Sequence, residues 1–315
     1  MSLHPDAERL LLMRREVGAK PFETMTPLEA RAAYAAGRGV LQPPPAPVGL
    51  VEGLSAPGPH GPIPLRRYRP FGSEPGRVLP TLVYLHGGGW VFGDLDSHDG
   101  VCRSLSNAAF CQIVSVDYRL APEHVFPAAV DDALAALRYV HANAAALAAD
   151  PARLMVGGDS AGGNLAAVLA LMARDGTAPP VIHQLLNYPV TDLTMSQDAY
   201  RRVTRDMPLT SVTMAWFIDH YLHGADATDW RASPLRAASL SGVAPATIVS
   251  AYYDPLCDDA VEYARRLSRE GVRVAHLHFS DQVHGFLTMG AVLRTSGTAI
   301  AMLGAALAQA VTEGG

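Results

Sequence analysis

The sequence predicts an α/β protein with a mostly parallel sheet of about eight strands, covered by helices on both faces and completed by a helical cap. Three observations carry this prediction. From Leu79 onward, short and almost continuously apolar runs alternate with longer helical runs. Hydrophobic residues make up 49% of the 315 residues and charged residues 17%, which is enough apolar material for a large core. One long interval, residues 188–243, has no convincing core strand and is expected to lie outside the sheet.

The expected strands are short runs rich in Val, Leu and Ile. They are 82–85, 113–116, 154–156, 181–186, 246–250 and 272–279, and the helical runs that separate most of them are 97–109, 127–149, 161–174 and 258–270. Two further extended segments, Val48–Leu54 and Ile63–Arg69, flank a turn-rich stretch and predict an antiparallel hairpin at a sheet edge. In parallel sheets, ligands bind beyond the carboxyl ends of the strands, so residues that follow strands are the first candidates for a site.

Two helical elements precede the sheet. Residues 5–17 and 26–36 have the helical spacing of apolar side chains. Gly37 and Gly39 are expected to end the second helix, and a proline-rich connector follows them. We therefore expect residues 1–42 to form a small helical unit apart from the main body.

A further helical segment is expected in the insertion at 191–235. Its helix-like run, 211–222, contains Trp216, Phe217 and Tyr221, which require an apolar surface to cover. An insertion of this size beside an active site is typical of a lid, although a surface excursion with no role in binding is the alternative. In chain order we expect an N-terminal part of the cap (1–42), the first part of the core (43–190), the cap insertion (191–235) and the second part of the core (236–315).

Charge and cysteine content argue against several functional classes. The net charge of −5 disfavours nucleic acid or an anionic membrane as the main partner. The three cysteines, Cys102, Cys111 and Cys257, have no metal-ligand spacing, and their odd number disfavours a disulfide framework. The N-terminus does not read as a secretory signal, so we expect a cytoplasmic protein without membrane insertion. His276 and His278 alternate along one strand but lack further ligands nearby, so no metal is expected.

The stretch 157–163 reads Gly-Gly-Asp-Ser-Ala-Gly-Gly and lies between an expected strand and an expected helix. A G-x-S-x-G pattern at such a turn holds the serine in a strained conformation and lifts its hydroxyl clear of the sheet. Ser160 is therefore the candidate nucleophile, and the N–H of Ala161 is a candidate donor to a developing negative charge. The alternative is a glycine-rich turn with an incidental serine.

A second glycine-rich loop, His86-Gly87-Gly88-Gly89-Trp90, follows the strand expected at 82–85. Three consecutive glycines cost folding entropy, so their backbone is expected to do something that a side chain would prevent. We predict that Gly87 and Gly88 join Ala161 as oxyanion donors and that His86 orders the loop. The alternative is a loop that is merely flexible.

An acid and a base are expected after later strands. Asp254 and His284 each follow one, and the chain order Ser160, Asp254, His284 is that of an α/β-hydrolase triad. His284 would take the serine proton and return it to the leaving group, while Asp254 would orient the imidazole ring. Asp117 and Glu123 also follow a strand but are expected to brace the architecture.

These blocks together resemble the hormone-sensitive-lipase-like carboxylesterases, the bacterial family IV esterases of the α/β-hydrolase superfamily. In family order they are HGGGW (86–90), DYRLAPEHVFPAAVDDALAAL (117–137), GDSAGGNLA (158–166), YPV (188–190), DPL (254–256) and VHGF (283–286). The resemblance implies an α/β-hydrolase fold whose cap combines 1–42 with the insertion. It also implies hydrolysis of short- to medium-chain acyl esters without a cofactor, and frequent dimerisation through the sheet edge near Val272–Phe279.

The remaining expectations concern the substrate. Trp90, Tyr188, Trp216 and Phe217 are expected to contact a small-molecule ester. A lactonase, an amidase or an acyltransferase could use the same triad, because fold and triad do not set the substrate. A non-catalytic receptor of this fold is the alternative from another class, although retention of all three triad residues speaks against it.

The sequence departs from the family pattern after DPL. It reads Cys257-Asp258-Asp259-Ala260 where many relatives have Arg, Asp, Glu and Gly. The departure touches no triad member. It leaves the hydrogen bonding around Asp254 as an open question for the structure.

Overall fold

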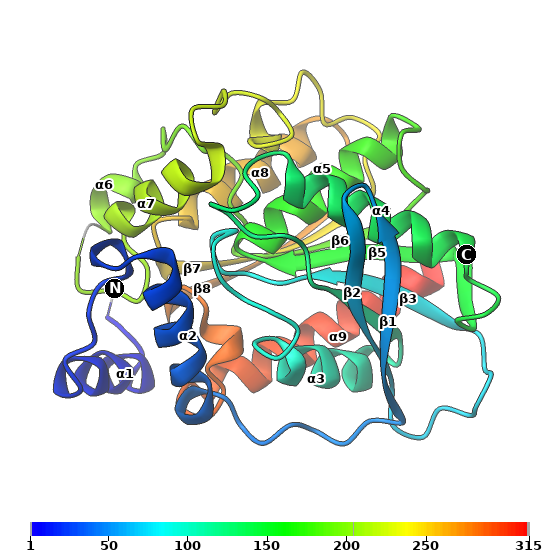
Figure 1. The fold of residues 1–315 in the computed structure, drawn as a ribbon, viewed down its shortest axis with the longest axis horizontal. Helices are drawn as coiled ribbons and strands as arrows, with labels where there is room; N and C mark the ends of the chain where they lie inside the picture. The colour runs from blue at the N-terminus through cyan, green and yellow to red at the C-terminus, as the bar shows by residue number, and fades with distance from the viewer. Residues whose placement is uncertain (1, 204, 314–315) are drawn as a thin grey trace.

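An eight-stranded sheet forms the centre of the computed structural model, which describes residues 2–203 and 205–313 (Figure 1). The strand order is β1-β2-β4-β3-β5-β6-β7-β8, and neighbouring strands from β4 to β8 are parallel. The strands are β1 (Leu50–Gly58), β2 (Gly61–Arg69), β3 (Leu79–Leu85), β4 (Gln112–Val116), β5 (Ala149–Asp159), β6 (His183–Asn187), β7 (Ala246–Tyr253) and β8 (Val274–Val283). The predicted α/β-hydrolase fold class and strand number are confirmed.

β1 and β2 form the predicted antiparallel hairpin at one edge of the sheet. Their register runs from Leu50 opposite Arg69 to Gly58 opposite Gly61, so both strands run further toward the turn than the sequence pattern indicated, while β1 begins two residues later than expected. β2 also pairs antiparallel with β4, which joins the hairpin to the parallel strands. The alternating Ile63 and Leu65 are buried, as expected for a strand with one face on the core.

Helices cover both faces of the sheet (Figure 1). α4 (Ala128–Ala142), α5 (Ala161–Arg174) and α8 (Cys257–Arg269) lie on one face, and α3 (Asp99–Ala109) and α9 (Thr295–Glu313) lie on the other. Each face has its own apolar core, with Leu137, Leu165 and Leu267 in one and Leu105, Leu303 and Leu307 in the other. A strand packed on both faces needs apolar side chains on both, which explains why β3 and β4 are buried along their whole length.

α9 is the one helix in the described part of the chain that is long and apolar enough to cross a membrane. Its Leu303 and Leu307 are fully buried in the core beneath the sheet. Gly304 faces Ala108 of α3 so closely that an added Cβ would lie 2.4 Å from the alanine methyl group. The helix therefore packs tightly against α3.

The N-terminal helices and the insertion lie together at one end of the sheet (Figure 1). Their elements are α1 (Pro5–Glu16), η1 (Phe22–Thr24), α2 (Pro27–Leu41), α6 (Ala199–Arg202), α7 (Ser211–Leu222) and η2 (Pro234–Arg236), while η3 (Phe286–Thr288) follows β8. The helix predicted at 211–222 is confirmed. The hydroxyl of Thr213 on α7 donates to Glu23 of η1 at 2.7 Å, which ties the two parts to each other.

Gly37 and Gly39 do not end α2, which continues to Leu41. That prediction was wrong. A glycine inside a helix costs about 0.5–1 kcal/mol relative to alanine, and tertiary contacts can offset this cost. Such a contact lies between the two glycines, where the Arg38 guanidinium is 2.8 Å from the carboxylate of Asp94.

Candidate active site

Ser160 lies at the sharp turn between β5 and α5. Its backbone has φ 55° and ψ −118°, a conformation that non-glycine residues rarely adopt. A Cβ added to Gly162 would lie 1.9 Å from the carbonyl oxygen of Leu85, and one added to Gly158 would lie 2.3 Å from the same oxygen. The glycines therefore let the turn pack directly on β3. The N–H of Ser160 donates to the carbonyl of Asn187 at 2.9 Å, which holds the strained residue in place.

An unbroken chain of hydrogen bonds joins Ser160 to His284 and Asp254. His284 Nε2 lies 3.1 Å from Ser160 Oγ, and His284 Nδ1 lies 2.7 Å from Asp254 Oδ2. Asp254 is fully buried and accepts a second hydrogen bond, 2.8 Å long, from the N–H of Leu256. Because an ionised carboxylate only accepts, the proton of a neutral His284 is held on Nδ1 and Nε2 faces the serine hydroxyl. The structure thus brings together the three residues that the sequence predicted as a triad.

The glycine loop between β3 and α3 corrects one predicted oxyanion donor. The N–H of Gly87 points to the carboxylate of Asp159, with a nitrogen–oxygen distance of 3.1 Å, so it is not directed at a substrate. Gly88 and Gly89 line the pocket beside Ser160 instead. Their N–H groups have no acceptor in the parts of the chain that the structure describes. Gly87 and Gly88 were the donors predicted in this loop. The geometry instead favours Gly88 and Gly89, together with Ala161 at the start of α5.

Asp159, the residue before the candidate nucleophile, anchors this loop from behind. Its carboxylate accepts from the Tyr84 hydroxyl at 2.9 Å and from the Gly87 N–H, and lies 3.1 Å from His98 Nε2. Burial opposes its charge, but the His98 ring and the Tyr84 hydroxyl hold the pKa of the Asp159 carboxyl below its usual value. A buried anion with several donors is therefore built into the wall of the site.

His86 contacts the same loop, because its Nδ1 lies 2.8 Å from the carbonyl oxygen of Gly87. Its ring is fully buried and stacks on Tyr118 with 4.2 Å between ring centroids. Burial and the neighbouring His98 lower the pKa of His86 to about 4, so the ring is neutral at physiological pH. These contacts agree with the expected role of ordering the loop.

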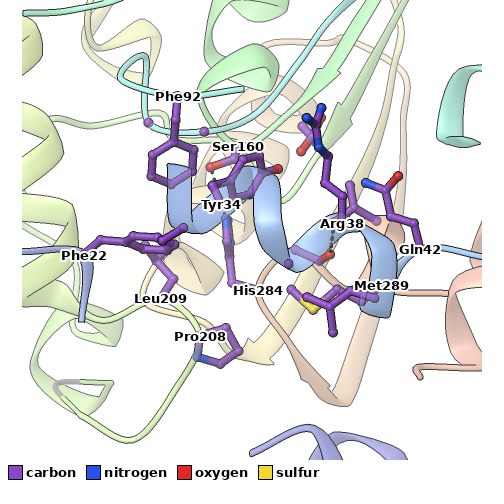
Figure 2. Close-up of a pocket in the computed structure, with 18 of the residues that line it drawn as sticks. Phe22, Tyr34, Arg38, Gln42, Phe92, Ser160, Pro208, Leu209, His284 and Met289 are labelled. Carbon is purple, nitrogen blue, oxygen red and sulfur yellow. Dashed lines mark hydrogen bonds between the residues drawn. The ribbon is translucent and has the colours of Figure 1, made fainter. Parts of the chain in front are cut away.

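A pocket with a volume of about 160 Å³ opens beside Ser160 and His284. In the view of Figure 2, Phe22, Phe92 and Leu209 lie to one side of Ser160, and Arg38 and Gln42 lie to the other. Phe92 is the centre of the apolar wall: its ring contacts Phe22, Tyr34 and Phe217 at centroid distances of 4.9, 4.4 and 5.1 Å. The pocket thus combines an aromatic wall with a polar one.

Of the four residues expected to contact substrate, Phe217 lines this pocket. Trp90 is fully buried behind the glycine loop, where it stacks on Tyr221 with 4.2 Å between centroids. Tyr188 is buried beneath His284 and meets the His284 ring edge-on, with 4.8 Å between the ring centroids. Trp216 packs on its helical neighbours. The expectation of direct contact with a ligand in this pocket is therefore not supported for these three residues.

Sequence reasoning missed three features of the site. Asp159 had a visible signal, since an acidic residue next to the nucleophile on a buried strand needs donors around it. Gly89 belongs to the same glycine run as the predicted donors, and only the direction of each N–H distinguishes them. Phe92 had no local signal, because the aromatic wall that it centres joins segments far apart in the chain.

The residues that depart from the family pattern, Cys257 to Ala260, lie at the start of α8 and connect this helix to the insertion. Asp259 Oδ2 accepts the N–H groups of Thr191 and Asp192 at 2.8 and 2.9 Å, and Asp258 accepts the N–H of Ala199 at 2.8 Å. Burial raises the pKa of Asp259 to about 8. The two acidic side chains therefore hold the start of the insertion on the helix that follows Asp254.

Three of the other polar residues singled out in the sequence, Glu123, His276 and His278, have structural partners. Glu123 lies 2.6 Å from Arg31 of α2 and so braces the N-terminal unit against the loop after β4. His276 and His278 both lie 2.8 Å from the hydroxyl of Ser250 on β7. Burial raises the pKa of Asp117 to about 6.

Ser160 lies on a strand–helix turn and is hydrogen-bonded to His284, which is in turn hydrogen-bonded to Asp254. His284 and Asp254 each follow a later strand of the same sheet. This arrangement defines an α/β-hydrolase with a serine nucleophile.

The alpha/beta hydrolase fold family matches residues 82–288. The Mycobacterium tuberculosis protein "Carboxylic ester hydrolase LipN" is 47% identical over 76% of this chain and 65% of its own length. "Ethyl acetate hydrolase" of Pseudomonas putida is 41% identical over 78% of each chain. The hyperthermophilic esterase from Pyrobaculum calidifontis has a similar structure, with a TM-score of 0.91, 38% identity and coverage of 98% and 99%. The chain belongs to the hormone-sensitive-lipase-like family of α/β-hydrolases, a family of carboxylic ester hydrolases.

Proposed function

We propose that this chain is a serine carboxylesterase that hydrolyses esters of short- to medium-chain acids through a covalent acyl-enzyme. The observation that carries the proposal is the hydrogen-bonded chain from Asp254 through His284 to Ser160, at the wall of a pocket of about 160 Å³. The printed name of the Pseudomonas putida relative, an ethyl acetate hydrolase, supports the short end of this substrate range.

In the acylation step, Ser160 Oγ attacks the ester carbonyl carbon while its proton passes to His284 Nε2. His284 then gives this proton to the departing alkoxide, so that an alcohol leaves and the acyl group stays on the serine. Water enters next, gives a proton to His284, and adds to the acyl carbon. Collapse of the second intermediate returns the proton to Ser160 and releases the acid. Asp254 stabilises the imidazolium that forms in both steps.

The negative charge that develops on the carbonyl oxygen needs donors fixed in advance. We assign this role to the N–H groups of Gly88, Gly89 and Ala161. Backbone donors in a water-poor site need no reorganisation during the reaction, and loss of one typically lowers kcat by about 10²–10³-fold. Asp159 acts through Gly87, because it holds the loop that presents the two donors.

The cap sets the length of the acyl chain in this proposal. Residues 1–42 supply Phe22 and Tyr34, and the insertion 191–235 supplies Leu209 and Phe217 to the pocket wall. Each methylene buried against such a wall contributes about 0.8 kcal/mol, and the contribution ends where the wall ends. Chains longer than the pocket must stay in water or displace cap residues.

Two finer expectations about the whole protein are also proposals. Strand β8 lies at the edge of the sheet, so a second copy can pair with it near Val272–Phe279 and form a homodimer. Light scattering after size exclusion measures whether the chain is a monomer or a dimer. A cytoplasmic location is the second proposal: Cys102, Cys111 and Cys257 are all free and buried, as suits a reducing compartment, and fractionation of the producing cell would test it.

The activity is tested with p-nitrophenyl esters from acetate to palmitate, beside a lactone and an anilide. We expect ester hydrolysis to dominate, with kcat/KM highest at butyrate or hexanoate. A fluorophosphonate probe should label Ser160 in the wild type, and Ser160→Ala should lose both the label and nearly all turnover. Labelling at another serine, or activity that survives Ser160→Ala, would exclude the assigned nucleophile. A preference for the lactone or anilide would exclude the carboxylesterase assignment.

A further inference from the structure

A second cavity lies outside the catalytic pocket and shares part of its lining. It has a volume of about 640 Å³ and lies between the end of α1, η1 and the segment 205–213. Arg14, Phe22 and Pro208 line both cavities. Arg14, in the last turn of α1, therefore lies at the junction between the outer cavity and the chamber that contains Ser160.

The outer cavity is cationic although the chain as a whole carries a net charge of −5. Its charged lining residues are Arg14, Arg15, Lys20 and Arg205 against Glu23 and Asp206. Both acids have partners: Glu23 accepts from the Thr213 hydroxyl at 2.7 Å, and Asp206 lies 4.0 Å from Arg15. A cavity with a surplus of one sign of charge concentrates ligands of the opposite sign. The lining therefore favours anions at the approach to the catalytic pocket.

Arg14 itself is a partly buried cation without a protein counterion. Within the described residues, no carboxylate oxygen lies within 4 Å of its guanidinium. Arg38, the other arginine in the catalytic pocket, differs because Asp94 neutralises it at 2.8 Å. Burial lowers the pKa of Arg14, which indicates that its surroundings replace part of its water shell without supplying a negative charge.

The position of Arg14 at the end of α1 does not by itself explain why it is partly buried with no counterion among the described residues. A cation in the last turn of a helix is stabilised by the helix dipole. Arg15 beside it has the same stabilisation, yet it is exposed and lies next to Asp206. Arg14 alone of the two also lines the catalytic pocket. A planar guanidinium pairs with a carboxylate through two parallel hydrogen bonds, which is the strongest contact available to it.

We propose that Arg14 forms an anion subsite and that the preferred substrates are esters carrying a free carboxylate on the acyl or the alcohol part. This inference rests on the proposed ester hydrolysis at Ser160 and specifies its substrate class. The carboxylate pairs with the Arg14 guanidinium at the junction of the two cavities while the ester carbonyl lies at Ser160. The cationic outer cavity draws such substrates toward the site.

The test compares matched pairs of anionic and neutral esters. Mono-p-nitrophenyl glutarate is paired with p-nitrophenyl pentanoate for the acyl side, and 4-acetoxybenzoate with 4-acetoxybenzamide for the alcohol side. Wild type is compared with Arg14→Gln, with Arg14→Lys, and with Arg9→Gln as the control. Arg9 lies exposed on the same helix and outside both cavities, so its loss changes the net charge equally.

In one of the two pairs, Arg14→Gln should lower the anionic-to-neutral ratio of kcat/KM by about 10- to 100-fold, mainly through KM of the anionic ester. Arg14→Lys should keep part of the preference, and Arg9→Gln should keep the wild-type ratio. The pair that responds shows which half of the ester carries the carboxylate. Added salt should reduce the preference of the wild type for the anionic ester. This measurement does not depend on whether any variant folds.

Two results would overturn the subsite. One is a ratio that Arg14→Gln leaves as in the wild type for both pairs, and the other is a wild-type ratio that does not respond to salt. Failure of the proposed function has a different signature, because the wild type would then hydrolyse neither member of either pair.

Discussion

Adding a methyl group to Gly89 tests whether Phe217 of the cap fixes the position of the glycine loop, residues 86–90. A Cβ at this position would lie 2.2 Å from Cδ1 and 2.3 Å from Cγ of Phe217. Ordinary carbon contacts are about 3.5–4.0 Å, so the loop and the ring must separate by more than 1 Å. The ring has little freedom to move, because Phe217 is buried and packs on Phe92 and Trp216. The loop is therefore the part that shifts.

A shift of this size removes the N–H of Gly89 from the position where the oxyanion forms. Loss of one donor costs about 10²–10³-fold in kcat, which is roughly 3–4 kcal/mol of transition-state stabilisation. KM should change little, because the charge that the donor meets is absent from the bound ester. Thermal unfolding should show only a modest loss of stability. The φ angle of Gly89 is +58°, and other residues occupy this region at a cost of about 1–2 kcal/mol.

The assay is a double-mutant cycle on p-nitrophenyl butyrate hydrolysis. Phe217→Ala removes the atoms that the new Cβ would meet, so Gly89→Ala should cost less than tenfold in kcat when it is made in the Phe217→Ala background. Gly88→Ala is the matched control. Its Cβ would lie 2.1 Å from the backbone carbonyl oxygen of Phe92, a clash that Phe217→Ala cannot relieve. Independent effects of Gly89→Ala and Phe217→Ala would refute the reasoning that the cap holds this loop.

Three further predictions follow from the buried carboxylates and the cap. Asp159→Asn removes the charge that holds Gly87, so kcat should fall about 10–100-fold and the free energy of unfolding by about 1–3 kcal/mol in denaturant titrations; unchanged kcat would refute the positioning role. Asp259 has its pKa raised from 3.8 to about 8, so the folded protein keeps a proton that the unfolded chain has lost between these values, and stability falls as pH rises through this window. Asp259→Asn should therefore raise the melting temperature at pH 9 more than at pH 5, and an equal change at both would contradict it. Deleting residues 1–42 should flatten the chain-length profile, whereas an unaltered optimum would show that the cap does not measure the acyl chain.

What the sequence alone determined is local in the chain. The strand–turn–helix around Ser160 and the glycine run after β3 are contiguous patterns whose meaning follows from backbone sterics and hydrophobic period. Asp254 and His284 were found one at a time, each as a polar residue that follows an apolar strand. The helix at 211–222 was predicted to its ends, because Thr210 directly before it caps its first turn and its own residues form the apolar face. The parallel sheet then brings post-strand residues to one edge without further information.

Only the tertiary structure decided which groups face the substrate. Gly87 and Gly89 are chemically identical, and Asp159 in another strand determines that the first N–H is taken while Phe217 from the insertion packs on the second glycine. Trp90 stacks away from the pocket because Tyr221 offers it a parallel ring. The direction of each of these groups is set by contacts between segments many residues apart, and no local pattern of apolar, polar or glycine residues encodes such contacts.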